Sequence, residues 1–148
     1  MQENKFVSNY IDDLIQVNFE RMAAFDEASR VINDEDLKNY FDSKAGESER
    51  NIEELQIARL NGSQQNNAAN GKPFLPATST FTNAVNRKKL NVIVDAARCV
   101  EKHMVEWYQK IEDGLFSIPG ELKNLLQQQL SELKTGQSYL HRMTTSLK

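Results

Sequence analysis

The sequence predicts an all-α fold, a bundle of four long amphipathic helices with a long crossover between the second and third helices. Three observations predict it. Apolar residues recur at steps of three and four along four segments, Gly and Pro are scarce outside one stretch, and that stretch separates the second segment from the third. The 148 residues suit one domain, residues 1–148, with enough chain to bury a core.

The first helix is expected from Asn4 to about Val31, with a broad apolar face interrupted at its middle by Asn18 and Arg21. A second apolar row widens this face: Ile11, Ile15, Phe19 and Met22. The row either lies under a connecting loop or forms an interface in a homo-oligomer. We favour the loop, because a long connection must cross the bundle somewhere.

The second helix is expected between Asn33, a good N-cap, and Gly62, which suits the left-handed position after a helix. Its apolar stripe consists of Leu37, Phe41, Ala45, Ser48, Ile52 and Leu55. The stripe thins halfway along, at Ala45 and Ser48. Helical periodicity places Glu47 beside this gap, at the edge of the buried face.

The crossover is expected as a loop over residues 62–79, rich in Gly, Asn, Gln and Ser, followed by a short helical piece over residues 80–90. An extended loop of this length spans the bundle, so the second and third helices are predicted to run parallel. The basic cluster Arg87, Lys88 and Lys89 has no interleaved aromatic residues. We interpret it as a solvated turn and expect no binding to nucleic acid.

The third helix is expected from about Asn91 to Asp113 and is closed by Gly114. The fourth follows a short turn, with Ser117 as its cap and Pro119 in its first turn. Because this connection is short, the third and fourth helices are predicted to be antiparallel neighbours. With a long second connection, the topology is that of ferritin-like bundles.

Polar residues near the midpoint of each helix are the candidates for chemistry. Di-iron sites in bundles use two single Glu residues and two Glu-x-x-His pairs, and such pairs are missing here. The candidate metal ligands are Glu47, Glu101 and Glu132, all expected at the flanks of their stripes, and Arg50 and Thr135 stand where histidines would follow. We favour a metal-free polar layer in which Arg21 or Arg50 pairs with Glu47 or Glu101. A site for iron or another divalent metal and simple exposure are the alternatives.

The sequence contains no recognisable catalytic site. Cys99 and His103 are one turn apart, but no oxyanion donor or cleft accompanies them. His103 is expected in the core or at its edge, and His141 at the surface. The single cysteine, the absence of a signal peptide and the absence of a membrane-spanning stretch favour the cytoplasm, with no membrane association.

Four segments of the chain, residues 13–28, 37–56, 96–113 and 118–136, resemble a bacterial ferritin-like, rubrerythrin-related four-helix-bundle family of unknown function, of the domain of unknown function 2383 type. The resemblance implies a ferritin-like fold and a stress-associated, cytoplasmic setting, without an established reaction. It also implies a carboxylate where Met22 stands and a histidine where Gln137 stands, and both departures weaken metal binding.

The sequence therefore predicts a non-catalytic bundle protein with a degenerate metal site and no cofactor, which acts through its surface or as a homo-oligomer. Two alternatives stay open. One is a metal-binding protein of di-iron type that uses Glu47, Glu101 and Glu132. The other is a helical protein-interaction module that binds another helix along the second apolar row.

Overall fold

A computed structural model describes residues 2–60, 73–114 and 120–146. Over these ranges it contains five helices and no strand, which confirms the all-α prediction. Four of the helices are long: α1 (Gln2–Val31), α2 (Glu35–Leu60), α4 (Leu90–Gly114) and α5 (Gly120–Ser146). The short helix α3 (Ala77–Arg87) lies between α2 and α4 in the chain. Gly62, Ser117 and Pro119, the expected helix-end residues, lie outside the described ranges.

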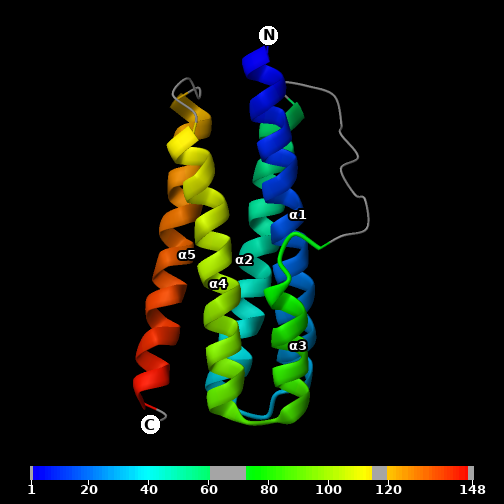
Figure 1. Cartoon of the computed structure of the whole chain (residues 1–148), viewed down its shortest axis with the longest axis vertical. Helices are drawn as coiled ribbons and strands as arrows, with labels where there is room; N and C mark the ends of the chain where they lie inside the picture. The colour runs from blue at the N-terminus through cyan, green and yellow to red at the C-terminus, as the bar shows by residue number, and fades with distance from the viewer. Residues whose placement is uncertain (1, 61–72, 115–119, 147–148) are drawn as a thin grey trace.

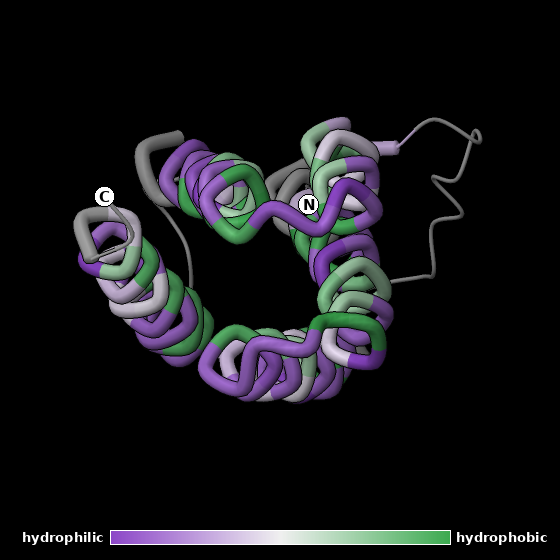
Figure 2. The backbone as a smooth tube through the Cα atoms, turned by 90° about the horizontal axis from the view of Figure 1, so that it is seen from below, coloured by the Kyte–Doolittle hydropathy of each residue, from purple (hydrophilic) through white to green (hydrophobic). Residues whose placement is uncertain are grey.

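The long helices form two antiparallel pairs, α1 with α2 and α4 with α5 (Figure 1). In Figure 1, α1 and α5 run from top to bottom, whereas α2 and α4 run from bottom to top. The parallel course of α2 and α4 agrees with the expected long crossover. Contacts are extensive within each pair and much fewer between the pairs, where α1 meets α4 and α2 meets α5. Figure 2 shows the same helices from below, with α3 beside α1 and α4.

The beginning of α2 differs from the prediction by one residue. Asp34, rather than Asn33, caps the helix, because its Oδ1 accepts a hydrogen bond from the Leu37 amide at 3.0 Å. A cap residue reaches the amide three positions ahead, and Asn33 stands one residue too early for this bond. Glu35 and Asp36 then place two carboxylates in the first turn, where the helix dipole favours negative charge.

The short helix begins and ends earlier than the expected 80–90. It begins after Pro76, whose fixed φ suits the first turn of a helix, and Ala77–Arg87 are helical. It ends at Lys88, which adopts a left-handed conformation with φ of 60° and donates its amide hydrogen to the Val85 carbonyl at 3.1 Å. The expected solvated turn at 87–89 is exposed as predicted.

Part of the crossover covers the second apolar row of α1. Ile11 and Ile15 are buried in the same apolar cluster as Leu75, and Phe74 packs against that cluster. The Glu20 carboxylate accepts the amide hydrogens of Phe74 at 2.9 Å and Leu75 at 2.7 Å, which holds this segment against α1. The interpretation of the row as a surface beneath a connection is confirmed for its first two members. Phe19 remains 44% exposed.

The core consists of two apolar clusters at different heights of the helices. One is centred on the rings of Phe25, Phe41 and Phe81, whose centroids lie 4.9 to 5.2 Å apart. The other contains Leu14, Leu55, Met104 and Leu133, all fully buried. Along α1, α2 and α4, buried polar residues separate the two clusters at one height. None of the helices described combines the length and apolar character needed to cross a membrane.

Candidate functional site

The buried polar residues between the two apolar clusters form one connected layer. Its centre, which we call the arginine cluster, consists of Arg21 on α1, Tyr40, Lys44, Glu47 and Ser48 on α2, and Glu101 on α4. All but Lys44 are buried, and Lys44 is only 16% exposed. Buried charges are tolerated only when they are paired, so the geometry of their contacts decides what this layer can do.

Arg21 is fully buried and contacts residues from two other helices. Its Nε donates to Glu101 Oε1 at 2.8 Å, and its Nη2 donates to Glu101 Oε2 at 2.7 Å. The third nitrogen, Nη1, donates to the Ser48 hydroxyl at 2.9 Å and to the Lys44 carbonyl at 3.3 Å. Paired parallel hydrogen bonds of this kind are the strongest contact between an arginine and a carboxylate.

Glu47 supplies the second carboxylate. Its Oε1 lies 3.0 Å from Arg21 Nη1, and its Oε2 accepts a hydrogen bond from Lys44 Nζ at 3.0 Å. The first contact is an ion pair without hydrogen-bond geometry, since the hydrogens of Nη1 are directed to Ser48 and to the Lys44 carbonyl. Two cations thus face two carboxylates, and the charges of the cluster cancel.

Tyr40 connects the cluster to α5. Its hydroxyl donates to Glu101 Oε2 at 2.8 Å, with the Gly136 carbonyl as a second acceptor at 3.3 Å. Gly136 is buried, and a Cβ atom there would lie 3.0 Å from the Tyr40 hydroxyl and 3.3 Å from Glu101 Oε2. The missing side chain at this position therefore lets the backbone of α5 approach the cluster closely.

A chain of neutral groups extends the layer toward the other end of the molecule. Asn18 Oδ1 accepts from Ser48 at 2.9 Å and from Asn51 at 3.3 Å, while its amide donates to the Tyr108 hydroxyl at 3.0 Å. Tyr108 in turn donates to Gln129 Oε1 at 2.6 Å. This chain links α1, α2, α4 and α5 through side-chain hydrogen bonds.

Burial and charge shift the pKa values of the layer in consistent directions. Burial disfavours the charged guanidinium of Arg21, but attraction to Glu101, the hydrogen bonds with it, and the charge of Glu47 outweigh burial and raise the pKa. Burial raises the pKa of Tyr40, and the adjacent Glu101 charge adds to the effect. Burial also raises the pKa of Tyr108. The layer therefore keeps a permanent cation and two neutral phenols.

The family model described as Domain of unknown function (DUF2383) matches residues 6–113, which is 108 of the 148 residues of the chain. The chain belongs to this family. No curated protein and no solved structure matches it significantly. The matched range includes Arg21, Glu47 and Glu101, whereas α5 lies outside it.

The DUF2383 structure brings two of the three candidate ligands together. Glu47 and Glu101 both contact Arg21, which is one of the pairings that the sequence favoured. Glu132 is not part of this cluster, because it pairs at the surface with Arg50 at 2.9 Å. The flank position predicted for Glu101 is wrong, since this side chain is fully buried. The helix α4 packs against three other helices, α1, α3 and α5. Its buried surface is therefore wider than the single apolar stripe used for the prediction, and it includes Glu101.

The two residues considered as a nucleophile and base are both exposed in the DUF2383 protein. The core or edge position predicted for His103 is wrong: its side chain is 48% exposed and its Nδ1 lies 3.2 Å from Glu106 Oε1. Cys99 is exposed. His141 is exposed as expected, and its Nδ1 lies 3.1 Å from Arg98 Nη2.

The residues of the layer do not fit a di-metal centre. The buried carboxylates of Glu47 and Glu101 are engaged by Arg21, a cation that repels metal ions. Met22, where the resemblance implies a carboxylate, packs against the apolar clusters, and Gln137, where it implies a histidine, faces a groove on the outside of α4 and α5. The described part of the chain contains no group of three or more His, Cys, Asp or Glu side chains that could hold a metal.

Sequence reasoning missed Tyr40 and Gly136. In α2 a polar row runs beside the apolar stripe at steps of four, three and four: Tyr40, Lys44, Glu47 and Asn51. That row is the sequence signal for a polar layer facing another helix. Gly136 stands three residues after Leu133 and four before Leu140, on the inward face of α5. A glycine inside a helix stripe indicates close approach of a neighbouring group.

Proposed function

We propose that this DUF2383 protein is a ferritin-like four-helix-bundle protein that acts without a metal centre and without catalysis. An internal arginine takes the place between the mid-helix carboxylates that metal ions take in di-metal bundles. The role of the arginine is to hold the two helix pairs together, and the protein then acts through its surface or as a homo-oligomer.

The observation that carries the proposal is the position of the Arg21 guanidinium, hydrogen-bonded to both oxygens of Glu101 and 3.0 Å from Glu47. In di-metal bundles, carboxylates from several helices converge on two cations near the middle of the bundle. Here carboxylates from α2 and α4 converge on a cation that belongs to α1.

The chemistry of a guanidinium supports a structural role. It stays protonated in proteins and donates hydrogen bonds, so it neutralises carboxylates but performs no redox or Lewis-acid chemistry. Because Arg21 and Glu101 are fully buried, a substrate has no direct access to this pair. The contact joins α1 to α4, two helices from different pairs, where few other contacts are made.

The setting proposed for the protein comes from the resemblance and from composition. The resemblance to ferritin-like, rubrerythrin-related bundles of unknown function implies a cytoplasmic, stress-associated setting. A partner helix along the second apolar row of α1 receives less support, because Ile11 and Ile15 are buried and Phe19 is the only exposed member of that row.

Metal analysis of the purified protein tests the proposal. The protein is produced with iron, zinc and manganese supplied, and its metal content is measured for wild type, Glu47→Gln and Glu132→Gln. We expect well under one metal ion per chain in all three proteins. Glu132→Gln removes the same charge from a surface ion pair and tests the third candidate ligand separately.

One outcome overturns the proposal: stoichiometric metal in the wild-type protein that is lost in Glu47→Gln, with or without a loss in Glu132→Gln. That result establishes the metal-binding alternative with Glu47 as a ligand. Circular dichroism of each variant checks that a loss of metal does not reflect a loss of helical structure.

A further inference from the structure

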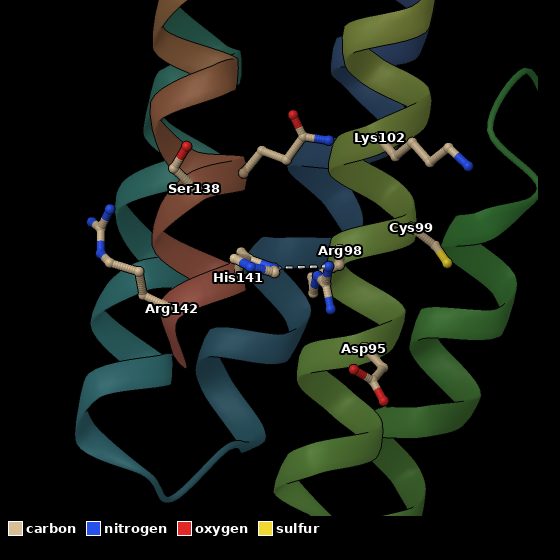
Figure 3. A pocket seen from close by; sticks show the side chains of 8 residues that line it. Asp95, Arg98, Cys99, Lys102, Ser138, His141 and Arg142 are labelled. Atoms are coloured by element: carbon tan, nitrogen blue, oxygen red, sulfur yellow. Dashed lines mark hydrogen bonds between the residues drawn. The ribbon is translucent and has the colours of Figure 1, made fainter. Parts of the chain in front are cut away.

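A groove with a volume of about 700 Å³ lies between α4 and α5, apart from the arginine cluster (Figure 3). Its lining comes from one face of each helix: Asp95, Arg98, Cys99 and Lys102 from α4, and Gln137, Ser138, His141 and Arg142 from α5. Apart from Cys99, the lining residues have polar or charged end groups, although their carbon atoms make up more of the exposed lining than their nitrogen and oxygen atoms. The end groups favour a hydrophilic ligand.

The charge of the groove is opposite to that of the whole chain. Its lining has the cations Arg98, Lys102 and Arg142 and the single carboxylate of Asp95. The chain as a whole has a formal net charge of −3. A concave surface lined mainly by one sign of charge concentrates ligands of the opposite sign.

The cations of the groove are not neutralised within the described residues. Four of the arginines of the chain, Arg21, Arg30, Arg50 and Arg59, form ion pairs with carboxylates. Arg98 and Arg142 form none with any carboxylate in the described ranges, and neither does Lys102. Their charges therefore remain available to an external anion.

The centre of the groove is the contact between Arg98 and His141, which reach toward each other from α4 and α5 (Figure 3). Arg98 Nη2 lies 3.1 Å from His141 Nδ1, so the guanidinium of Arg98 contacts an imidazole nitrogen instead of a carboxylate. An arginine has five N–H donors in a planar fork that matches the oxygens of phosphate or carboxylate. Lys102 and Arg142 extend to opposite sides of this contact, away from each other.

We propose that this groove, which we call the basic groove, binds a small phosphate-type oxyanion at the Arg98 guanidinium. The guanidinium supplies paired donors for two oxygens of the anion, and the neutral polar residues Ser138 and Gln137 belong to the same lining. The ligand class is a small phosphorylated molecule. An extended nucleic acid needs a longer basic surface than one groove on an acidic chain.

The probe for this site is inorganic pyrophosphate, titrated into the full-length protein with detection by calorimetry and by amide chemical shifts. Wild type is compared with Arg98→Gln and with Arg87→Gln. Arg87 is the matched control: it is exposed, forms no ion pair in the described part of the chain, and lies outside the groove. Both substitutions change the net charge equally.

We expect wild type to bind and Arg98→Gln to bind at least about tenfold more weakly, the size of one charge-assisted hydrogen bond. Arg87→Gln is expected to bind within about twofold of wild type, because a distant exposed charge is screened. Chemical shifts should change mainly at residues 95–102 and 137–142. Arg142→Gln, as a second variant, is expected to show a smaller loss than Arg98→Gln.

Three results overturn the inference. The first is no pyrophosphate binding by wild type at millimolar concentrations. The second is an equal loss in Arg98→Gln and Arg87→Gln, which means general attraction by net charge. The third is binding only to vesicles of anionic lipid and not to pyrophosphate, which assigns the groove to a membrane surface. The melting temperature of each variant confirms that the fold is intact.

Discussion

Two arginines of this protein show what burial does to the same side chain. Arg21 is fully buried and is held by Glu101, Glu47 and Ser48 at hydrogen-bond or ion-pair distance. Arg98 lies in an open groove and contacts a histidine nitrogen in place of a carboxylate. Every nitrogen of the buried Arg21 has a hydrogen-bond partner, whereas Arg98 has one such contact among the described residues, with His141.

The two arginines differ in their partners because only Arg21 is removed from water. A guanidinium removed from water loses its hydration and is tolerated only with carboxylates and further acceptors around it. At the surface, water supplies these contacts, and an arginine without a carboxylate costs little. A paired buried arginine therefore indicates a structural contact, and an unpaired arginine in a concave surface indicates a candidate ligand contact.

The largest expected effect comes from removing the buried cation. Arg21→Met leaves two carboxylates without their partner, and we expect a loss of about 3–5 kcal/mol in the free energy of unfolding at pH 7. Arg98→Met should change it by less than about 0.5 kcal/mol. Urea denaturation measures both. A second change, Glu101→Gln in the Arg21→Met background, should recover part of the loss; equal effects of the two arginine variants would contradict the comparison.

The next effect concerns the hydroxyl that contacts Glu101. Tyr40→Phe removes a hydrogen bond to a charged acceptor, and we expect a loss of about 1.5–3 kcal/mol in the free energy of unfolding. Tyr139→Phe is the matched control, since this ring is partly exposed and stacks on Tyr40 at 5.2 Å; its effect should be within about 0.5 kcal/mol.

The contribution of Tyr40 to stability is also expected to depend on pH in the alkaline range. The pKa of Tyr40 is raised above its ordinary value of 10.0, chiefly by burial and then by Glu101, so the folded state holds this proton more tightly than the unfolded state. Its contribution to stability is present below pH 10 and falls as the pH rises further. Denaturation at pH 9 to 11 should therefore show a shallower loss for Tyr40→Phe than for wild type.

Two glycines test the close approach of α5. A Cβ atom at Gly46 would meet no other atom within 4 Å, so Gly46→Ala should gain about 0.5–1 kcal/mol through helix propensity. A Cβ atom at Gly136 would meet Tyr40, Glu101 and the Lys44 side chain at 3.0 to 3.3 Å. We expect Gly136→Ala to lose about 1 kcal/mol, because overpacking outweighs propensity. Equal gains in the free energy of unfolding at both positions would contradict this expectation, because they would show that the arginine cluster shifts to accommodate the added methyl group.

The smallest expected effect concerns two neighbouring carboxylates on α1, Asp12 and Asp13. Asp12 forms an ion pair with Arg59 at 2.8 Å, whereas burial, and then the charge of Asp12, raise the pKa of Asp13. A raised folded-state pKa favours folding below the ordinary value of 3.8, and this benefit is lost as the pH rises through the folded pKa. Asp13→Asn should therefore gain a few tenths of a kcal/mol at pH 7 and nothing near pH 3, while Asp12→Asn should be destabilising at pH 7.

The four long helices were predictable because their apolar spacing is regular over many turns. Their ends agree with the structure within a few residues, but the cap of α2 depends on the single bond between Asp34 and Leu37, which composition does not reveal. The short helix was expected too late in the chain, since Pro76 is typical of a loop unless its role at a helix start is considered.

The pairing of buried charges in the polar layer could be predicted from the sequence, but not all of the residues that form the layer. The need of a buried charge for a partner indicated Arg21 or Arg50 with Glu47 or Glu101. Arg21 makes these contacts, whereas Arg50 pairs with Glu132 at the surface. The burial of Glu101 was missed, although it stands four residues after Ala97 and three before Met104 on the inward face. Gly136 was missed because the sequence does not show that Tyr40, 96 positions earlier, packs against this glycine.

The hydrogen bonds of the arginine cluster join residues that are far apart along the polypeptide. Arg21 and Glu101 are separated by 80 positions, Tyr40 and Glu101 by 61, and Tyr40 and Gly136 by 96. Contacts of such long range form after local hairpins, since they require most of the chain to be in place. We therefore expect the cluster to assemble on the native side of the folding barrier, so that its loss accelerates unfolding and leaves the rate of folding almost unchanged.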